Sequence, residues 1–252
     1  MAKLYFIVKR LLSILFLIWC SIVFTSIMLL ILPFILLSTW ILKGKQSQDV
    51  CFIFIKSWAW LFSFLCFFRV KIEGRELVDP KKAYIYVPNH NSYLDTVVAV
   101  MAIPKSFKPL GKIEMLKAPI FGLIYRKVVV LIDRKSAESR AKCIQDLKIE
   151  LAAGQSILIF PEGTMNRTNN PLAHFYDGAF RLAIETQTPI VPLIVINARN
   201  LLSRNYPLDA RPGPISVILA DPIPVDGLVE SDLPKLKEQV YRIMEELIIT
   251  NS

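Results

Sequence analysis

Two long apolar segments near the start of the chain limit its fold more than any other feature of the sequence. Residues 11–42 include no charged side chain, and residues 50–68 are interrupted only by Lys56. A straight helix over the first segment would span about 48 Å, against a hydrocarbon core of about 30 Å. The segment also exceeds the roughly 7 to 15 apolar residues of a secretory signal core and has no cleavage site, so we expect it to remain on the mature protein.

The excess length of the first segment leaves its topology open. Pro33 is a candidate for a kink or for the bend of a re-entrant hairpin. Basic side chains flank both segments, which fits either a monotopic helical pair or two spans. Both arrangements put the N-terminus and the bulk of the chain on the same membrane face, expected to be the cytoplasmic one. The alternative is a buried helical hairpin in a soluble protein.

The formal net charge of +9 favours contact with an anionic surface. About +5 falls before residue 69 and +4 after it, so membrane lipids with anionic headgroups are the expected partner. Nucleic acid is not predicted, because no run of lysines and arginines is interleaved with base-stacking aromatics. Four cysteines without C-x-x-C spacing and only two histidines predict neither a disulfide framework nor a metal site.

After residue 68 short apolar runs alternate with helical patterns, which predicts an α/β fold. Ser136 is a predicted helix cap, followed by apolar Ile144, Leu147 and Leu151 at helical spacing and by Gly154 as the stop. One boundary separates a helical membrane anchor, residues 1–68, from an α/β domain, residues 69–252. The predicted strands cover residues 83–87, 127–132, 156–160, 190–196 and 215–219, and two further helices cover residues 179–185 and 233–248.

A histidine and a carboxylate five positions apart, His90 and Asp95, follow the first predicted strand. Loops at strand ends of α/β sheets commonly carry functional groups. If the chain turns into a helix there, the carboxylate can accept from one ring nitrogen and leave the other free to take a proton. The alternative is an ordinary capping or hydrogen-bonded histidine.

A second polar stretch, residues 160–164, ends the apolar run that begins at Ser156 and is followed by Arg167. Its Gly163 permits close backbone approach, Glu162 and Thr164 can orient polar groups, and an arginine can hold a phosphate. The alternative is a turn with a solvated arginine. Arg134, also at a strand end, is a candidate for phosphate contact or for a local salt bridge.

Together these stretches resemble the glycerophospholipid acyltransferases, most closely the bacterial 1-acylglycerol-3-phosphate (lysophosphatidic acid) acyltransferases, over most of the chain after residue 69. The family's first motif, with histidine and aspartate separated by four residues, matches Asn89, His90 and Asp95. Its third motif matches residues 160–164 without a gap. Two weaker motifs, a strand-closing arginine and a proline within an apolar strand, match Arg134 and residues 191–193. The resemblance implies a sheet flanked by helices and an N-terminal two-helix anchor, in bacteria at the inner membrane.

One position departs from the family pattern, because Met165 stands where the family usually has arginine directly after the threonine. The next arginine is Arg167, two residues further along. Lys112 resembles another phosphate-contacting lysine of the family. The resemblance therefore implies that Lys112, Arg134 and Arg167 are candidates for holding the acceptor phosphate.

The resemblance implies direct acyl transfer without a cofactor. His90 would take the proton of the acceptor's 2-hydroxyl as it attacks a thioester of acyl carrier protein or coenzyme A, and Asp95 would stabilise the imidazolium. The acceptor would be 1-acylglycerol-3-phosphate and the product phosphatidic acid, a step of phospholipid synthesis. Ser92 is a rival nucleophile, but no G-x-S-x-G elbow surrounds it.

Three alternatives stay open at the level of sequence. The acceptor could be glycerol-3-phosphate, another lysophospholipid or an ornithine-type lipid, which the departure at Met165 allows. A membrane-bound lipid hydrolase would use His90 and Asp95 with water. A non-enzymatic lipid-binding or scaffold protein would bind lipid without turnover.

Overall fold

The computed structural model describes residues 1–251, with the backbone alone for residues 2–5. Within this range seven strands form one sheet in the order β1-β7-β6-β2-β5-β3-β4. Neighbouring strands are parallel except for the antiparallel pair β6 and β7. The strands are β1 (Phe68–Glu73), β2 (Ile85–Pro88), β3 (Phe107–Lys112), β4 (Val130–Ile132), β5 (Ser156–Leu158), β6 (Ile190–Ile196) and β7 (Gly213–Leu219).

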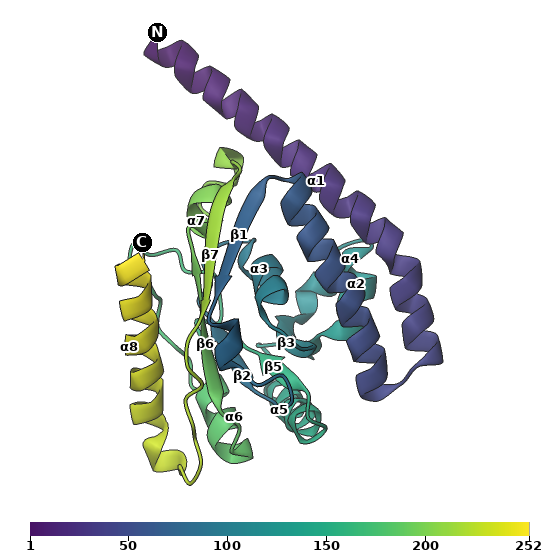
Figure 1. Cartoon of the computed structure of the whole chain (residues 1–252), viewed down its shortest axis with the longest axis vertical. Helices are drawn as coiled ribbons and strands as arrows, with labels where there is room; N and C mark the ends of the chain where they lie inside the picture. The colour runs from purple at the N-terminus through teal and green to yellow at the C-terminus, as the bar shows by residue number, and fades with distance from the viewer. Residues whose placement is uncertain (252) are drawn as a thin grey trace.

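Helices cover both faces of this sheet, as Figure 1 shows. The α-helices are α1 (Ala2–Ile41), α2 (Gly44–Leu65), α3 (Asp95–Ala102), α4 (Phe121–Val128), α5 (Ala137–Ala152), α6 (Gly178–Thr186), α7 (Ala198–Leu201) and α8 (Leu233–Asn251). Short 3-10 helices occupy η1 (Arg75–Leu77), η2 (Ile113–Lys117), η3 (Pro207–Asp209) and η4 (Glu230–Asp232). The predicted α/β fold with helices flanking a sheet and two apolar helices at the N-terminus is confirmed.

The sheet separates two apolar cores. In β2, Tyr86 packs with α2 and α3 on one face, whereas Ile85 and Val87 pack with α5, α6 and α8 on the other. This alternation follows from the two-residue period of a strand, and both faces are apolar because both are covered. A buried parallel sheet of this kind places the ends of its strands, rather than its faces, at the surface.

The two N-terminal helices form an antiparallel hairpin whose turn lies at residues 42–43 (Figure 1). The Phe24 ring packs edge-on against Trp58 and Phe62, with ring centroids 4.9 and 5.7 Å away. Both helices are long and apolar enough to cross a membrane, and only 22% and 33% of their most apolar windows are buried within the protein. The remaining apolar surface, including Leu30, Trp40 and other large side chains, faces outward.

The hairpin is fixed to the α/β domain near both ends of α1. Beside its turn, the Lys45 ammonium donates to the Gly154 carbonyl over 3.0 Å, and the Gln48 amide donates to the Phe107 carbonyl over 3.1 Å. Towards the N-terminus, Lys9 lies 3.5 Å from the Asp209 carboxylate. These contacts hold the hairpin along the α/β domain. Its turn therefore lies beside the starts of β3 and β5.

Several predictions of local structure are confirmed and some are wrong. Ser136 caps α5, since its hydroxyl accepts from the Ser139 N–H over 3.1 Å, but Ile144 is exposed and Cys143 is buried in its place. The strand predicted over residues 127–132 begins only at Val130, because residues 127 and 128 end α4. The re-entrant bend suggested at Pro33 is absent, because α1 continues through Pro33 and the chain reverses at residues 42–43.

Candidate active site

Polar segments from four strands meet at one edge of the sheet. His90 follows β2 and residues 160–164 follow β5, its neighbour, while Lys112 ends β3 and Arg134 follows β4. These strands run in the same direction as β6, so their carboxyl ends share one edge. Crevices at that edge are where open α/β sheets bind ligands. The topology therefore brings together segments that lie up to 74 positions apart in the chain, from His90 to Thr164.

His90 and Asp95 form a hydrogen-bonded pair at this edge. His90 Nδ1 lies 3.0 Å from Asp95 Oδ2, and Asp95 is the first residue of α3, where the helix dipole favours a negative charge. An ionised carboxylate can only accept, so Nδ1 carries the proton and Nε2 is left as an acceptor. The imidazole is 17% exposed and stacks on the Phe160 ring at a centroid distance of 4.0 Å.

The Asp95 carboxylate is held by the loop that precedes it. Its Oδ2 also accepts from the backbone N–H groups of Asn91 and Ser92, both over 2.7 Å. Among the described residues its Oδ1, which is buried, has no hydrogen-bond partner. All the donors are thus directed at the oxygen that faces the histidine, which fixes the carboxylate as the group that orients the ring.

Glu162 holds the backbone of His90 rather than projecting into solvent. Its Oε1 accepts from the His90 N–H over 2.6 Å, and its Oε2 accepts from the Ala173 N–H over 2.9 Å. Burial raises the pKa of the Glu162 carboxyl to about 6, against the opposing effect of these two backbone donors. The His90 carbonyl accepts in turn from the Asn166 N–H over 2.6 Å. The two motif segments are therefore joined through the main chain of the histidine.

Asn89 and Ser92 join the histidine loop to β6 and the segment after it. The buried Asn89 amide donates to the Val195 carbonyl over 3.0 Å and accepts from its N–H over 2.7 Å. Ser92 is fully buried, and its hydroxyl donates to the Leu202 carbonyl over 2.7 Å and accepts from the Leu94 N–H. A hydroxyl used in this way is a structural tie and is not available as a nucleophile.

Residues 160–164 form a tight turn whose geometry requires glycine at position 163. The Gly163 N–H donates to the Phe160 carbonyl over 3.0 Å, and Gly163 has a φ of +67°, in the left-handed region. A Cβ there would also lie 3.0 Å from the Tyr176 ring. The Gly163 carbonyl accepts a hydrogen bond from Arg134 Nη1. The turn thus presents Thr164 at the surface and draws the Arg134 guanidinium beside it.

Three cations surround the exposed end of this turn. Burial, followed by the charges of Arg134 and Arg204, lowers the pKa of the Lys112 ammonium. Arg204 Nη1 lies 3.4 Å from the Thr164 hydroxyl. Arg204 could not be predicted from the sequence, because it belongs to no motif and approaches the turn only through the fold. Arg167 is exposed, and no side-chain contact brings its guanidinium to this group within the described part of the chain.

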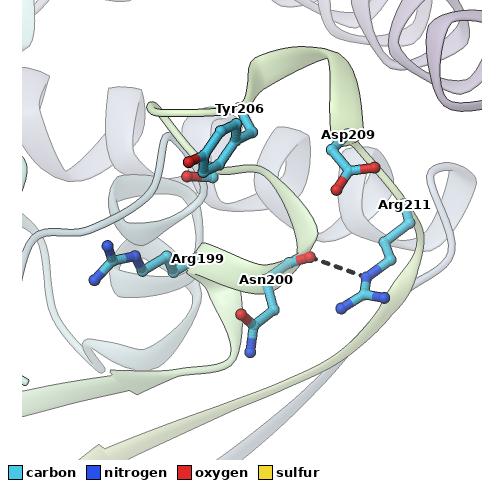
Figure 2. A pocket seen from close by; sticks show the side chains of 6 residues that line it. Arg199, Asn200, Tyr206, Asp209 and Arg211 are labelled. Atoms are coloured by element: carbon cyan, nitrogen blue, oxygen red, sulfur yellow. Dashed lines mark hydrogen bonds between the residues drawn. The ribbon is translucent and has the colours of Figure 1, made fainter. Parts of the chain in front are cut away.

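A cavity of about 230 Å³ lies on the same segment as Arg204 and is distinct from this cluster. Figure 2 shows that the Arg199 and Arg211 side chains extend in different directions, with Arg211 donating to the Asn200 carbonyl over 2.9 Å. These two arginines therefore do not converge on one anion. In the part of the chain that the structure describes, no three His, Cys, Asp or Glu side chains are placed to hold a metal ion.

Comparison with known protein families identifies this arrangement. Residues 69–196 match the family model described as acyltransferase, a range that includes the His90–Asp95 pair, the turn at residues 160–164, and both Lys112 and Arg134. The chain belongs to the acyltransferase family. The match ends at the last residue of β6, so Arg204 lies just beyond it.

Curated members of the acyltransferase family resemble the chain over most of its length. The mouse protein 1-acyl-sn-glycerol-3-phosphate acyltransferase alpha is 30% identical over 178 residues, which cover 70% of this chain and 62% of the relative. A 1-acyl-sn-glycerol-3-phosphate acyltransferase of Chlamydomonas reinhardtii is 32% identical over 160 residues, 63% of this chain and 48% of the relative. The chain therefore spans about half to three fifths of the length of these relatives.

A solved structure of the acyltransferase family has the same fold. The crystal structure of the 1-acyl-sn-glycerophosphate (LPA) acyltransferase PlsC from Thermotoga maritima superposes with a TM-score of 0.79 at 20% sequence identity. The likeness covers 95% of this chain and 97% of that one, so it includes the helical hairpin as well as the sheet.

Proposed function

We propose that the chain transfers a fatty acyl group from a thioester to the 2-hydroxyl of 1-acylglycerol-3-phosphate, which gives phosphatidic acid. The observation that carries this proposal is the His90–Asp95 pair, with Nδ1 bound 3.0 Å from the carboxylate and Nε2 left to accept a proton. The relatives from mouse and Chlamydomonas reinhardtii are named as acyltransferases for this acceptor, which supports the choice of substrate.

In the proposed reaction the acyl group passes directly from the thioester to the acceptor hydroxyl. Nε2 of His90 removes the proton from the acceptor hydroxyl as its oxygen attacks the thioester carbonyl. The tetrahedral intermediate collapses with cleavage of the carbon–sulfur bond, and the imidazolium returns the proton to the leaving thiolate. Asp95 stabilises the imidazolium through Oδ2 and keeps the ring in one orientation. No acyl-enzyme is needed, which agrees with the use of the Ser92 hydroxyl as a structural tie.

The acyl donor is proposed to be a thioester of acyl carrier protein or of coenzyme A. Both donors present the same acyl thioester to the attacking oxygen, so the histidine chemistry is common to them. A donor comparison with the same acyl chain on each carrier separates the two.

The helical hairpin is proposed to seat the enzyme in one leaflet at the cytoplasmic face of a membrane. The outward apolar surface of α1 and α2 suits the acyl region, while Lys45, Gln48 and Lys9 tie the hairpin to the α/β domain near both ends of α1. A hairpin held along the domain supports the monotopic arrangement over two spans, because its turn cannot reach the far side of a bilayer. The acceptor, with one acyl chain, and the product, with two, can then enter and leave the site by lateral movement within the bilayer.

The test uses the full chain purified and reconstituted in lipid vesicles. Acceptors are 1-acylglycerol-3-phosphate, glycerol-3-phosphate and a choline lysophospholipid, each with both thioester donors, and products are resolved by mass. We expect the diacyl phosphate product to dominate, and a preference for another acceptor would replace the substrate named here. Free fatty acid as the only product would favour a hydrolase, and binding without turnover would favour a lipid-binding protein.

Substitution of the histidine tests the mechanism in the same vesicles. His90→Ala should lower the transfer rate by about 10²- to 10⁴-fold while vesicle association stays normal, because base and anchor are separate. The matched control is His174→Ala, which removes the other, exposed histidine and should leave the rate unchanged. Near-normal transfer by His90→Ala would exclude this residue as the base.

A further inference from the structure

We infer that Arg204 binds the phosphate of the acceptor and makes the enzyme specific for a phosphorylated lysolipid. The inference rests on the proposed acyl transfer and adds to it the residue that selects the acceptor. Arg204 lies outside the range matched by the family model and outside every motif of the sequence.

The position of Arg204 is that of a cation without a counterion. Its side chain is half-buried, and Nη1 lies 3.4 Å from the Thr164 hydroxyl, a long hydrogen bond that uses one of five donors. Across residues 1–251 no carboxylate forms an ion pair with it. A planar guanidinium with free donors is suited to binding a phosphate through two hydrogen bonds.

Two further cations share the space in front of Arg204. Arg134 donates to the Gly163 carbonyl, next to the Thr164 hydroxyl that Arg204 reaches. Burial, followed by the charges of these two arginines, lowers the pKa of the Lys112 ammonium at the end of β3. Among the described residues that act on Lys112, Glu114 is the one whose charge raises this pKa. Three cations held together with so little negative charge are stabilised by an anion, and a phosphomonoester carries enough charge to do so.

The backbone around Arg204 is fixed to the histidine loop. Ser92 and Ser203 form an antiparallel bridge, and the Ser92 hydroxyl donates to the Leu202 carbonyl over 2.7 Å. The arginine thus follows directly after two residues that are bound to the loop carrying His90. A phosphate held by Arg204 is therefore kept at a set distance from Nε2 of His90. This is required because the reacting 2-hydroxyl lies on the carbon next to the one that bears the phosphate.

Arg204 also compensates for the methionine in the third motif. Met165 is half-buried directly after Thr164, the residue whose hydroxyl Arg204 reaches. Arg167, the next arginine in sequence, is exposed, and among the described residues its one hydrogen bond runs from the Asn205 amide to its backbone carbonyl, not to its guanidinium. The cation beside the Thr164 hydroxyl therefore comes from Arg204, 39 residues after Met165, and not from Arg167.

The test compares two acceptors that differ only in the phosphate, 1-acylglycerol-3-phosphate and 1-monoacylglycerol, with the full chain in vesicles. Arg204→Gln should raise the KM for the phosphorylated acceptor by about 10- to 100-fold. The KM for the thioester and kcat/KM for the phosphate-free acceptor should stay unchanged. Arg204→Lys keeps the charge but loses the planar set of paired donors, so its KM for the phosphorylated acceptor should lie between those of the wild type and Arg204→Gln.

Matched variants separate charge recognition from a folding defect. Arg199→Gln removes an arginine of the same segment that lines the separate cavity and should behave as wild type. The double variant Arg204→Gln with Met165→Arg, which restores a cation beside Thr164, should recover most of the lost affinity. Thermal midpoints in detergent confirm that each variant is folded.

Specific outcomes would overturn the inference. A rise in KM for both acceptors, no rise for either, or a larger effect of Arg167→Gln than of Arg204→Gln would each show that Arg204 does not select the phosphate. These outcomes differ from a failure of the proposed function, in which the wild-type chain itself acylates no phosphorylated lysolipid.

Discussion

The buried carboxylate of Glu162 accepts the backbone N–H of His90 over 2.6 Å, so the glutamate of one motif positions the histidine of the other. The contact is to the main chain, and the imidazole remains free to bind Asp95 through Nδ1. Glu162 is therefore expected to act on catalysis through geometry, which distinguishes it from a general acid or base.

Glu162→Gln should change how stability depends on pH. Burial raises the pKa of Glu162 from 4.5 in the unfolded chain to about 6, so the folded state prefers the protonated form. That preference contributes about 2 kcal/mol to the free energy of unfolding below pH 4.5, and the contribution is lost as pH rises through 6. Thermal unfolding in detergent between pH 4.5 and 7 should show this loss in the wild type and not in Glu162→Gln. Parallel curves for both proteins would contradict the assignment.

Asp95→Asn should lower kcat by about 10²- to 10⁴-fold. Oδ2 accepts from the ring N–H of His90 and from the backbone N–H groups of Asn91 and Ser92. An asparagine amide would either place its NH₂ against these three donors or place it at the buried Oδ1 position, which has no partner among the described residues. The substitution also removes the charge that stabilises the imidazolium. Steady-state rates in vesicles measure the effect, and retention of more than a tenth of kcat would exclude an essential role for the carboxylate.

Ser92→Ala should keep most of the turnover but destabilise the protein. Its hydroxyl is buried between the Leu202 carbonyl and the Leu94 N–H, and removing it leaves both groups without this partner, at a cost of about 1 to 3 kcal/mol. The thermal midpoint should fall while the initial rate per folded molecule changes little. A nucleophile would give the reverse result, with turnover abolished at a normal midpoint and an acyl-enzyme detectable by mass in the wild type.

Asn89→Ala should be among the more destabilising single substitutions near the site. The amide satisfies both the N–H and the carbonyl of Val195 on β6, and its loss leaves two buried backbone groups unpaired, at a cost of about 3 kcal/mol. Denaturant unfolding in detergent measures the change. Asn251→Ala, at the exposed end of α8, is the matched control and should have almost no effect.

The sequence predicted the parts of this protein that depend on short patterns. The strands after residue 150, the cap at Ser136 and the pairing of His90 with Asp95 all rest on neighbours within a few residues, and the structure contains them. The strand β3 was not predicted, because Pro109 and Gly111 interrupt it and it has no apolar alternation. Residues 127–132 were misread because a short apolar run does not distinguish the end of a helix from a strand.

The contacts that complete the site are long-range and have no sequence signature. Glu162 was predicted to orient polar groups, but the group it orients is the backbone of His90, 72 residues earlier. Arg204 reaches Thr164 across 40 residues only because β6 lies beside β2, with β5 on the other side of β2. One sequence does not record which strand neighbours which, so these two contacts could not be predicted from it.

The main chain of His90 is bound on both sides, its N–H by Glu162 and its carbonyl by Asn166. A histidine held in this way has little backbone entropy left to lose when the acceptor arrives. The site is therefore preorganised, and its rate should respond weakly to agents that only restrict loop motion, such as viscous cosolvents. A rearrangement of the loop that carries His90 is therefore not expected to limit turnover.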